Sequence, residues 1–281
     1  MEKFLVLGGE GMLGHMVVKY LKSLVDFEVY FTTRNENSSE GIYFDANKNP
    51  EKIEEIIKRV NPDVIVNCIG IVVSLVREDN RDMVTFINSY LPHKIANICK
   101  ANNTKLIHIS SDCVFSGKEG GYTENSLYSP IDFYGLTKAT GEVNDNHNLT
   151  IRTSIIGPEI KEPKTGLMEW FFSQKGKEVK GFTKAIWSGV TTLELAKRIV
   201  EMHQKNVAGI INIASQPINK YDLLCLIKKV YNLNIMIEPD DSVISDRSMK
   251  TIRKDVNYSV PSHENMLIEL KEWIDSQGKQ P

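Results

Sequence analysis

Short apolar runs alternate with longer amphipathic stretches along the first half of the chain. The runs rich in β-branched residues are 3–7, 27–32, 42–44, 63–69 and 104–110, and helical spacing is found at 12–24, 50–59 and 92–101. Runs that are apolar at nearly every position are typical of strands buried on both faces. Because these runs alternate with helical stretches, the pattern predicts a doubly wound parallel sheet, which binds ligands at the carboxyl ends of its strands.

The second half of the chain is less regular. Its strand-like runs are 149–153 and 209–214, and its helical stretches are 132–146, 220–231 and 264–276. Residues 157–187 carry loop signals and little periodicity, so we expect irregular structure there.

Together these patterns predict an α/β fold with two parts. Residues 1–153, with roughly 188–214, are expected to form a Rossmann-type doubly wound parallel sheet. Residues 154–187 and 215–281 are expected to form a smaller discontinuous α+β lobe that closes over the sheet edge. A lobe in that position suits the binding of a substrate beside a ligand held by the sheet.

Composition and charge exclude several classes of protein. Hydrophobic residues make up 41% and charged residues 25% of the 281 positions, which argues against long disorder. The net charge of -2 leaves no broad basic field for nucleic acid or anionic lipid. The first apolar run is too short for a signal peptide, and no apolar stretch approaches the ~18–20 residues of a membrane span. We therefore expect a cytoplasmic protein that binds neither nucleic acid nor membrane.

The four cysteines give no sign of a metal site or a disulfide framework. Cys68, Cys99, Cys113 and Cys225 are widely spaced, and no CxxC pair occurs. No acid–histidine cluster has the spacing of metal ligands, so we expect no metal. Covalent catalysis by Cys113 is disfavoured because no partner histidine is evident.

A glycine-rich turn follows the first predicted strand. Gly8, Gly11 and Gly14 form GxxGxxG at the mouth of the first predicted helix, with Met12 and Leu13 between the last two glycines. In this strand–turn–helix context the glycines let a pyrophosphate approach the backbone, and the helix dipole attracts it. We predict that all five residues bind a dinucleotide cofactor; the alternative is a turn with only a structural role.

The end of the second predicted strand bears on which dinucleotide is bound. A carboxylate there accepts hydrogen bonds from the ribose of NAD, whereas this chain has Thr33 and Arg34. Arginine suits the 2′-phosphate of NADP, so NADP(H) is favoured over NAD(H); a solvated surface arginine is the alternative. Asp45, after the third predicted strand, is a candidate for the adenine amino group or a cap for the next helix.

A catalytic pattern lies in the middle of the chain. Tyr134 and Lys138 are four residues apart in YGLTK, which places both side chains on one helix face. A lysine ammonium lowers the pKa of a neighbouring tyrosine towards the range of acid–base catalysis. Ser111 ends a buried strand upstream, where its hydroxyl faces the ligand crevice. Tyr90 and Lys94 have the same spacing, but no strand-end hydroxyl precedes them and Pro92 marks a helix start.

The segments SSDCVFSG, YGLTK and RTSIIG, with the glycine turn, resemble the extended short-chain dehydrogenases. The likeness is greatest to the dTDP-4-dehydrorhamnose reductases, whose segments read like STDYVFDG, YGxTK and RTSW. The resemblance implies that Ser111, Tyr134 and Lys138 are catalytic and that Lys138 also holds the nicotinamide ribose. It further implies that Asn67, Cys68, Ile69 and Gly70 line the cofactor, and that Asn88 has a structural or relay role.

Two departures from the family pattern fall in the expected sugar pocket. Cys113 stands where an aromatic residue is usual, and Ile155 stands where a tryptophan is usual. Asp112 is a candidate to bind a sugar hydroxyl or to brace the loop. Trp187 is a candidate to stack on the substrate or to pack between the lobes. With Ser111 and Tyr134, these residues form the expected substrate site.

The resemblance implies NADPH-dependent reduction of the 4-keto group of a nucleotide-activated deoxysugar for surface polysaccharide synthesis. The sugar is similar to dTDP-4-dehydrorhamnose or is a UDP-linked 2-acetamido-2,6-dideoxy-4-keto sugar. One alternative is an epimerase or dehydratase of the same superfamily. Another is a non-catalytic NADP-binding regulatory subunit, like the one beside methionine adenosyltransferase. The expected partner is a small nucleotide sugar, and a homodimer remains open.

Overall fold

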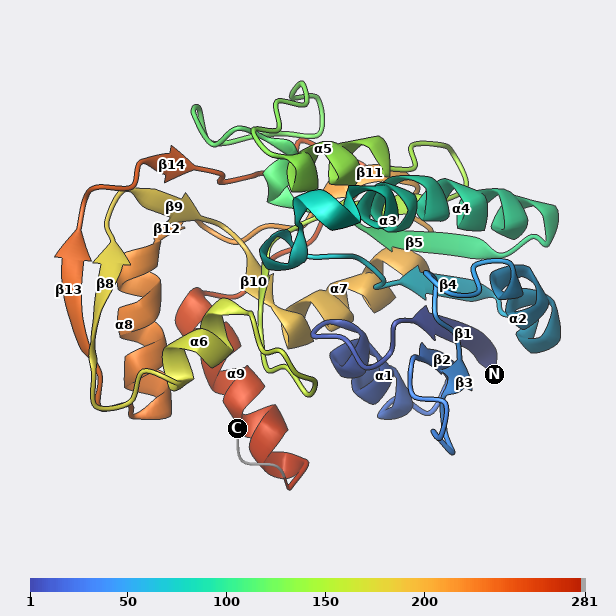
Figure 1. The fold of residues 1–281 in the computed structure, drawn as a ribbon, viewed down its shortest axis with the longest axis horizontal. Coiled ribbons are helices and arrows are strands. Elements are labelled where there is room, and N and C mark those ends of the chain that lie inside the picture. Colours follow the sequence, from blue (N-terminus) through green and yellow to red (C-terminus); the bar gives the residue numbers. More distant parts are fainter. Residues whose placement is uncertain (279–281) are drawn as a thin grey trace.

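The computed structural model describes residues 1–278 (Figure 1). Its strands are β1 (Glu2–Leu7), β2 (Phe27–Thr33), β3 (Ile42–Tyr43), β4 (Val64–Asn67), β5 (Lys105–Ile109), β6 (Leu149–Arg152), β7 (Ile155–Ile156), β8 (Glu178–Phe182), β9 (Ala185–Trp187), β10 (Val190–Thr191), β11 (Gly209–Asn212), β12 (Ile218–Asn219), β13 (Met236–Asp240) and β14 (Ser245–Asp246). Its α-helices are α1 (Gly14–Lys22), α2 (Lys52–Val60), α3 (Arg81–Thr85), α4 (Leu91–Ala101), α5 (Phe133–Thr140), α6 (Leu167–Phe172), α7 (Thr192–Gln204), α8 (Lys220–Tyr231) and α9 (His263–Ser276). Shorter helical turns are η1 (Val73–Leu75), η2 (Glu78–Asn80), η3 (Phe86–Tyr90) and η4 (Asp112–Val114).

One large sheet dominates the described residues. Its seven strands lie in the order β11-β6-β5-β4-β1-β2-β3, and every neighbouring pair is parallel. The order reverses between β1 and β4, and a crevice at such a reversal is where open α/β sheets bind their ligands. The predicted Rossmann-type doubly wound sheet is confirmed.

The two faces of this sheet are covered by different helices. Phe4 and Val6 of β1 pack into one core with α1 and α7, whereas Leu5 and Leu7 pack into another with α2 and α4. Figure 1 shows these helix pairs on opposite sides of the sheet. Because alternate side chains enter different cores, each central strand is apolar at nearly every position.

A second group of elements lies at the other end of the molecule (Figure 1). Strand β8 pairs with β13, and β9 pairs with β12 and β14. A separate apolar core joins Phe171 of α6 to Leu223 and Ile227 of α8. In Figure 1 the chain from about residue 167 to 187 runs beside the chain from about 218 to 246, so distant segments build this region together.

Two expectations about local structure were wrong. Residues 157–187 are not irregular, because they contain α6, β8 and β9. Strand β8 is completed by β13 far along the chain, and local periodicity does not reveal such a pairing. The helix expected over 132–146 ends at Thr140, since Asp145 then accepts hydrogen bonds from the backbone of His147 and Asn148 in a turn.

Within residues 1–278, every helix is too short or too polar to cross a membrane.

Candidate active site

The end of β5 turns sharply into the crevice. Ser111 begins the turn η4, and its Oγ accepts a hydrogen bond from the Cys113 backbone N–H at 3.1 Å. The same hydroxyl donates to Asp112 Oδ1 at 3.1 Å. Both Ser111 and Asp112 are buried. The turn therefore presents a fixed hydroxyl at the carboxyl edge of the sheet, as the sequence predicts.

Helix α5 packs its first turn directly on η4. Asp132 caps the helix by accepting from the Gly135 N–H at 2.7 Å. A Cβ atom on Gly135 would lie only 2.2 Å from the Cys113 carbonyl oxygen, so a glycine is required at this contact. The side chain of Tyr134 is half-buried beside Ser111. The protein atoms around the Tyr134 hydroxyl exclude water from a phenolate, and this burial raises its pKa above the ordinary value.

Lys138 lies one helical turn beyond Tyr134. Its side chain is 5% exposed, and Nζ donates to the Ile109 carbonyl oxygen at 2.7 Å. Burial lowers the pKa of Lys138 to about 8, although the negative charge of Glu142 opposes the shift. The expected lowering of the tyrosine pKa is not seen in this structure. The ammonium is held on a strand carbonyl, and desolvation dominates the pKa of Tyr134.

A buried polar network supports this corner of the site. Glu142 accepts from Ser110 Oγ at 2.6 Å and from Tyr128 Oη at 2.6 Å. Arg152 forms a two-pronged ion pair with the same carboxylate, with Nη2–Oε2 at 2.8 Å and Nε–Oε1 at 2.9 Å. Its guanidinium also lies over the rings of Phe115 and Tyr128. The observed role of Arg152 is therefore the buried ion pair with Glu142.

The glycine turn has the shape that a dinucleotide needs. Gly8 has φ of 75°, and a Cβ atom on Gly14 would lie 2.1 Å from the Gly8 carbonyl oxygen. At Gly11 the nearest neighbour of such an atom is the Gly8 carbonyl oxygen at 3.4 Å, an ordinary van der Waals contact. Leu13 is buried, and α1 begins beside it with no side-chain cap among the described residues. These residues fit a pyrophosphate at the start of α1.

The end of β2 brings together the residues expected to choose the cofactor. Thr32 Oγ1 accepts from the Gly8 N–H at 2.9 Å and thereby ties β2 to the glycine turn. The Thr33 hydroxyl donates to Glu10, which also pairs with Lys161. Arg34 is exposed beside them. Sequence reasoning missed Glu10 and Lys161, because a carboxylate was sought only at the end of the second strand.

The loop after β4 is braced from two sides. Asn67 is buried; its Oδ1 accepts from the Ile69 N–H at 3.1 Å and its Nδ2 lies 3.2 Å from His108 Nδ1. Asn88 holds the backbone of Ile71 further along this loop. Its Oδ1 accepts from the Ile71 N–H at 2.8 Å, and its Nδ2 donates to the Ile71 carbonyl oxygen at 3.0 Å. Asn88 Nδ2 also lies 3.3 Å from Thr137 Oγ1 on α5.

Cys68 and Gly70 lie in the same loop. Burial raises the pKa of the Cys68 thiol to about 12, so it stays neutral.

Asp45 does not cap the helix that follows it, which was one of the two roles considered for it. Its Oδ1 accepts from the Asn47 N–H at 2.9 Å in a turn, and α2 begins only at Lys52.

Arg247 reaches the turn η4 from the irregular segment after β14. Its Nη1 lies 3.4 Å from Cys113 Sγ, and its charge opposes the burial that raises the pKa of Asp112. The Nε of Arg247 is buried without a hydrogen-bond partner among residues 1–278. Burial raises the pKa of Cys113 to about 12, which disfavours a nucleophilic thiolate. Sequence reasoning missed Arg247, because a lone arginine in an irregular segment follows no pattern.

Ile155 and Trp187 lie on short strands beside the large sheet. Ile155, in β7, pairs with Val190 of β10 and is half-buried. Trp187 is 7% exposed, packs in the core shared with α6 and α8, and donates its indole N–H to Ser154 Oγ at 2.8 Å. Packing between elements therefore accounts for the contacts of Trp187.

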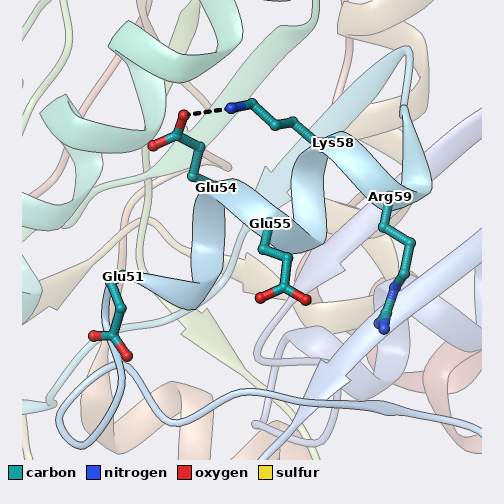
Figure 2. A pocket seen from close by; sticks show the side chains of 5 residues that line it. All are labelled: Glu51, Glu54, Glu55, Lys58 and Arg59. Atoms are coloured by element: carbon teal, nitrogen blue, oxygen red, sulfur yellow. Dashed lines mark hydrogen bonds and ion pairs between the residues drawn. The ribbon is translucent and has the colours of Figure 1, made fainter.

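A surface hollow on α2 has a different character. Figure 2 shows Glu51, Glu54, Glu55, Lys58 and Arg59 around it. The ion pair drawn there joins Glu54 and Lys58 at 2.8 Å, with side chains 52% and 63% exposed. These are solvated charges along a helix surface, unlike the buried side chains of Ser111 and Lys138.

Comparison with known proteins gives a family match over more than half of the chain. The family described as the RmlD substrate binding domain matches residues 2–168. The probable low-salt glycan biosynthesis reductase Agl14 of Haloferax volcanii is 27% identical over 75% of this chain and 74% of its own length. The methionine adenosyltransferase 2 subunit beta of Rattus norvegicus is 25% identical over 65% of this chain, and the match spans less than two thirds, 59%, of that protein.

Two solved structures show the same fold. A hypothetical dTDP-4-dehydrorhamnose reductase from Sulfolobus tokodaii has a TM-score of 0.76 at 28% identity, over 89% of this chain and 92% of that one. The dTDP-4-dehydrorhamnose reductase of Bacillus anthracis, solved in complex with NADP, has a TM-score of 0.81 at 18% identity, over 98% of this chain and 100% of that one.

Proposed function

The chain belongs to the RmlD substrate-binding domain family, and on that premise we propose that it reduces the 4-keto group of a nucleotide-activated deoxysugar with NADPH. The observation that carries the proposal is the corner formed by Ser111, Tyr134 and Lys138. Helix α5 packs on η4, so Tyr134 lies beside Ser111 at the carboxyl edge of the sheet, and Lys138 follows one helical turn later. A protein that only binds a dinucleotide would not require a serine hydroxyl, a tyrosine phenol and a lysine ammonium in this arrangement.

The cofactor has a suitable cradle in the chain. Gly8, Gly11 and Gly14, with Met12 and Leu13, would hold the pyrophosphate at the start of α1. Thr33 and Arg34 would bind the adenosine ribose and its 2′-phosphate, and the segment Asn67–Gly70 would line the nicotinamide side. Asp45 is our candidate for the adenine amino group. When bound, NADPH supplies the hydride for the C4 carbonyl carbon of the sugar.

The protein supplies the proton and the charge control. Tyr134 donates the proton of its hydroxyl to the oxygen of the developing alkoxide, and Ser111 turns its own hydroxyl proton from Asp112 to hydrogen-bond the same oxygen. The raised pKa of Tyr134 keeps this proton in place before the reaction. Lys138 stays protonated below about pH 8 and stabilises the phenolate that remains after the transfer.

We assign the substrate to the region where the smaller group of elements meets the catalytic turn. Residues 154–187 and 215–281 would form the lobe that holds the nucleotide sugar over residues 1–153 and 188–214. Asp112, Cys113, Ile155 and Trp187 are the proposed substrate contacts from the sequence, and Arg247 joins them because it reaches Cys113. The sugar is either dTDP-4-dehydrorhamnose-like or UDP-linked, for use in a surface glycan.

The direct test is oxidation of NADPH by the purified protein with a panel of dTDP- and UDP-linked 4-keto-6-deoxy sugars. Stoichiometric oxidation with one of them supports the proposal and identifies the sugar. Product formation without net NADPH oxidation would replace it with an epimerase or a dehydratase.

The variant Tyr134→Phe tests the catalytic assignment. Loss of the proton donor should lower kcat by roughly 10²–10⁴-fold. NADPH affinity, measured by quenching of tryptophan fluorescence, should change little, because the phenol does not hold the cofactor. Near-normal turnover in this variant would refute the role of Tyr134.

A second candidate is a non-catalytic NADP-binding regulatory subunit. It is favoured by the similarity to methionine adenosyltransferase 2 subunit beta from several vertebrates. This candidate predicts NADPH binding, no oxidation with any sugar, and altered activity of a methionine adenosyltransferase on mixing.

A further inference from the structure

Four polar side chains converge where β2 ends against the glycine turn. The Glu10 carboxylate accepts from the Thr33 hydroxyl and forms an ion pair with Lys161. Thr33 Oγ1 in turn accepts from the Asn35 N–H at 3.0 Å. Burial raises the pKa of Glu10, but the hydrogen bonds from Lys161 and Thr33 and the positive charges of Lys161 and Arg34 outweigh it, and the pKa lies below its ordinary value. The carboxylate is therefore ionised and faces two cations.

Lys161 is delivered by a segment far from the glycine turn in sequence. The segment 157–166 is fastened at Glu159, whose Oε2 accepts from the Gly166 N–H at 2.6 Å and whose own N–H donates to Glu169 Oε1 at 3.0 Å. A Cβ atom on Gly166 would lie 2.4 Å from Met12 Cε, so this segment packs against the glycine turn itself. Lys161 is 39% exposed and Glu10 is 21% exposed, which leaves both side chains accessible to a ligand.

The chemistry of this cluster suits both forms of a dinucleotide. A carboxylate at the end of the second strand accepts hydrogen bonds from a free ribose 2′-hydroxyl, whereas a cation there pairs with a 2′-phosphate. In most sites one residue makes the choice. Here the carboxylate comes from the glycine turn, one cation is Arg34, and the other cation is already paired with the carboxylate.

We propose that Glu10 and Lys161 form a pair that sets the preference between NADP(H) and NAD(H), an inference that rests on the proposed use of a nicotinamide dinucleotide. A 2′-phosphate takes the place of Glu10 as the partner of Lys161 and also engages Arg34. With a free 2′-hydroxyl, Glu10 accepts the hydrogen bond and keeps its pairing with Lys161. The chain therefore binds both dinucleotides, and the pair determines the ratio.

The test uses adenosine 2′,5′-bisphosphate and 5′-AMP, which differ only in the 2′-phosphate and need no sugar substrate. Their dissociation constants are measured by calorimetry for the wild type, Lys161→Met and Glu10→Gln. Lys161→Met should weaken the bisphosphate about tenfold and leave 5′-AMP within about twofold, because one charge-assisted contact is lost and Glu10 then repels the phosphate. Glu10→Gln should strengthen the bisphosphate about threefold or more and weaken 5′-AMP.

Lys164→Met is the matched control. Lys164 lies in the same segment with a similar exposure, 40%, but pairs with Glu169 at 3.1 Å. It should leave both dissociation constants unchanged. Equal effects of Lys161→Met on the two nucleotides, or none, would overturn the pair's role while leaving the reductase proposal intact. Failure of the wild type to bind either nucleotide would instead refute the cofactor assignment. Thermal unfolding of each variant verifies that it is folded.

Discussion

Two ion pairs mark the two ends of the proposed cofactor groove, and they differ in their access to water. Glu142 and Arg152 lie beneath the catalytic corner with side chains 1% and 2% exposed. Glu10 and Lys161 lie at the adenosine end with side chains 21% and 39% exposed. A buried pair cannot exchange partners without leaving a charge in a medium of low dielectric constant. A half-exposed pair can, because water or a ligand replaces the lost partner at small cost.

The two ion pairs are suited to different tasks, although both join a carboxylate to a cation. The buried pair fixes geometry, since Glu142 also holds Ser110 next to the catalytic turn and Tyr128 above it. The exposed pair is suited to recognition, because a ligand phosphate can compete for Lys161.

Arg152→Met should have the largest effect on stability. It leaves the Glu142 carboxylate buried without its ion-pair partner, which typically costs about 3–5 kcal/mol of unfolding free energy. Urea denaturation monitored by circular dichroism measures the loss. Adding Glu142→Gln removes the stranded charge and should recover part of it. A loss below about 1 kcal/mol for Arg152→Met alone would show that the pair is not what fixes this corner.

The pH dependence of the reaction should be the next largest effect. Because the pKa of Lys138 is lowered to about 8, its side chain is protonated and positively charged below that pH. The charge is lost as the pH rises through the pKa. If the charged form is the active one, kcat/KM is level below about pH 8 and falls about tenfold per pH unit above it. Initial rates on both sides of pH 8 measure this limb.

Lys138→Arg is the control for that assignment. The guanidinium stays charged at every pH used, so the descending limb should disappear even if the rate is lower throughout. An unchanged limb near pH 8 in this variant would place the titration on another group.

Lys58→Met should have the smallest effect. Its pairing with Glu54 on α2 is an exposed contact between side chains 63% and 52% accessible (Figure 2). Such pairs contribute little to folding, so the urea midpoint should not move measurably. A shift comparable to that of Arg152→Met would undo the distinction between buried and exposed pairs.

The residues of the proposed cofactor and catalytic sites could be picked out from the sequence because their signals are local. Gly8, Gly11 and Gly14 lie within seven residues, and Tyr134 and Lys138 lie one helical turn apart. Ser111 could be added because the carboxyl ends of parallel strands share one edge of the sheet. The structure places Tyr134 beside Ser111 and Lys138 one turn further along α5, and the catalytic roles of these residues stay predictions. The lowered pKa of Lys138 and its hydrogen bond to the Ile109 carbonyl were not predictable, since both depend on how α5 packs on β5.

The parallel sheet, the glycine turn and the spacing of Tyr134 and Lys138 follow from the sequence alone, because each depends on residues close together in the chain or on strand periodicity. Only the tertiary structure revealed the pairing of β8 with β13, the approach of Arg247 to Cys113 and the pairing of Glu10 with Lys161. Each of these contacts joins segments more than fifty residues apart. Electrostatic and hydrogen-bond partners are set by distance in space, and side chains brought together by packing leave no repeating pattern in the sequence.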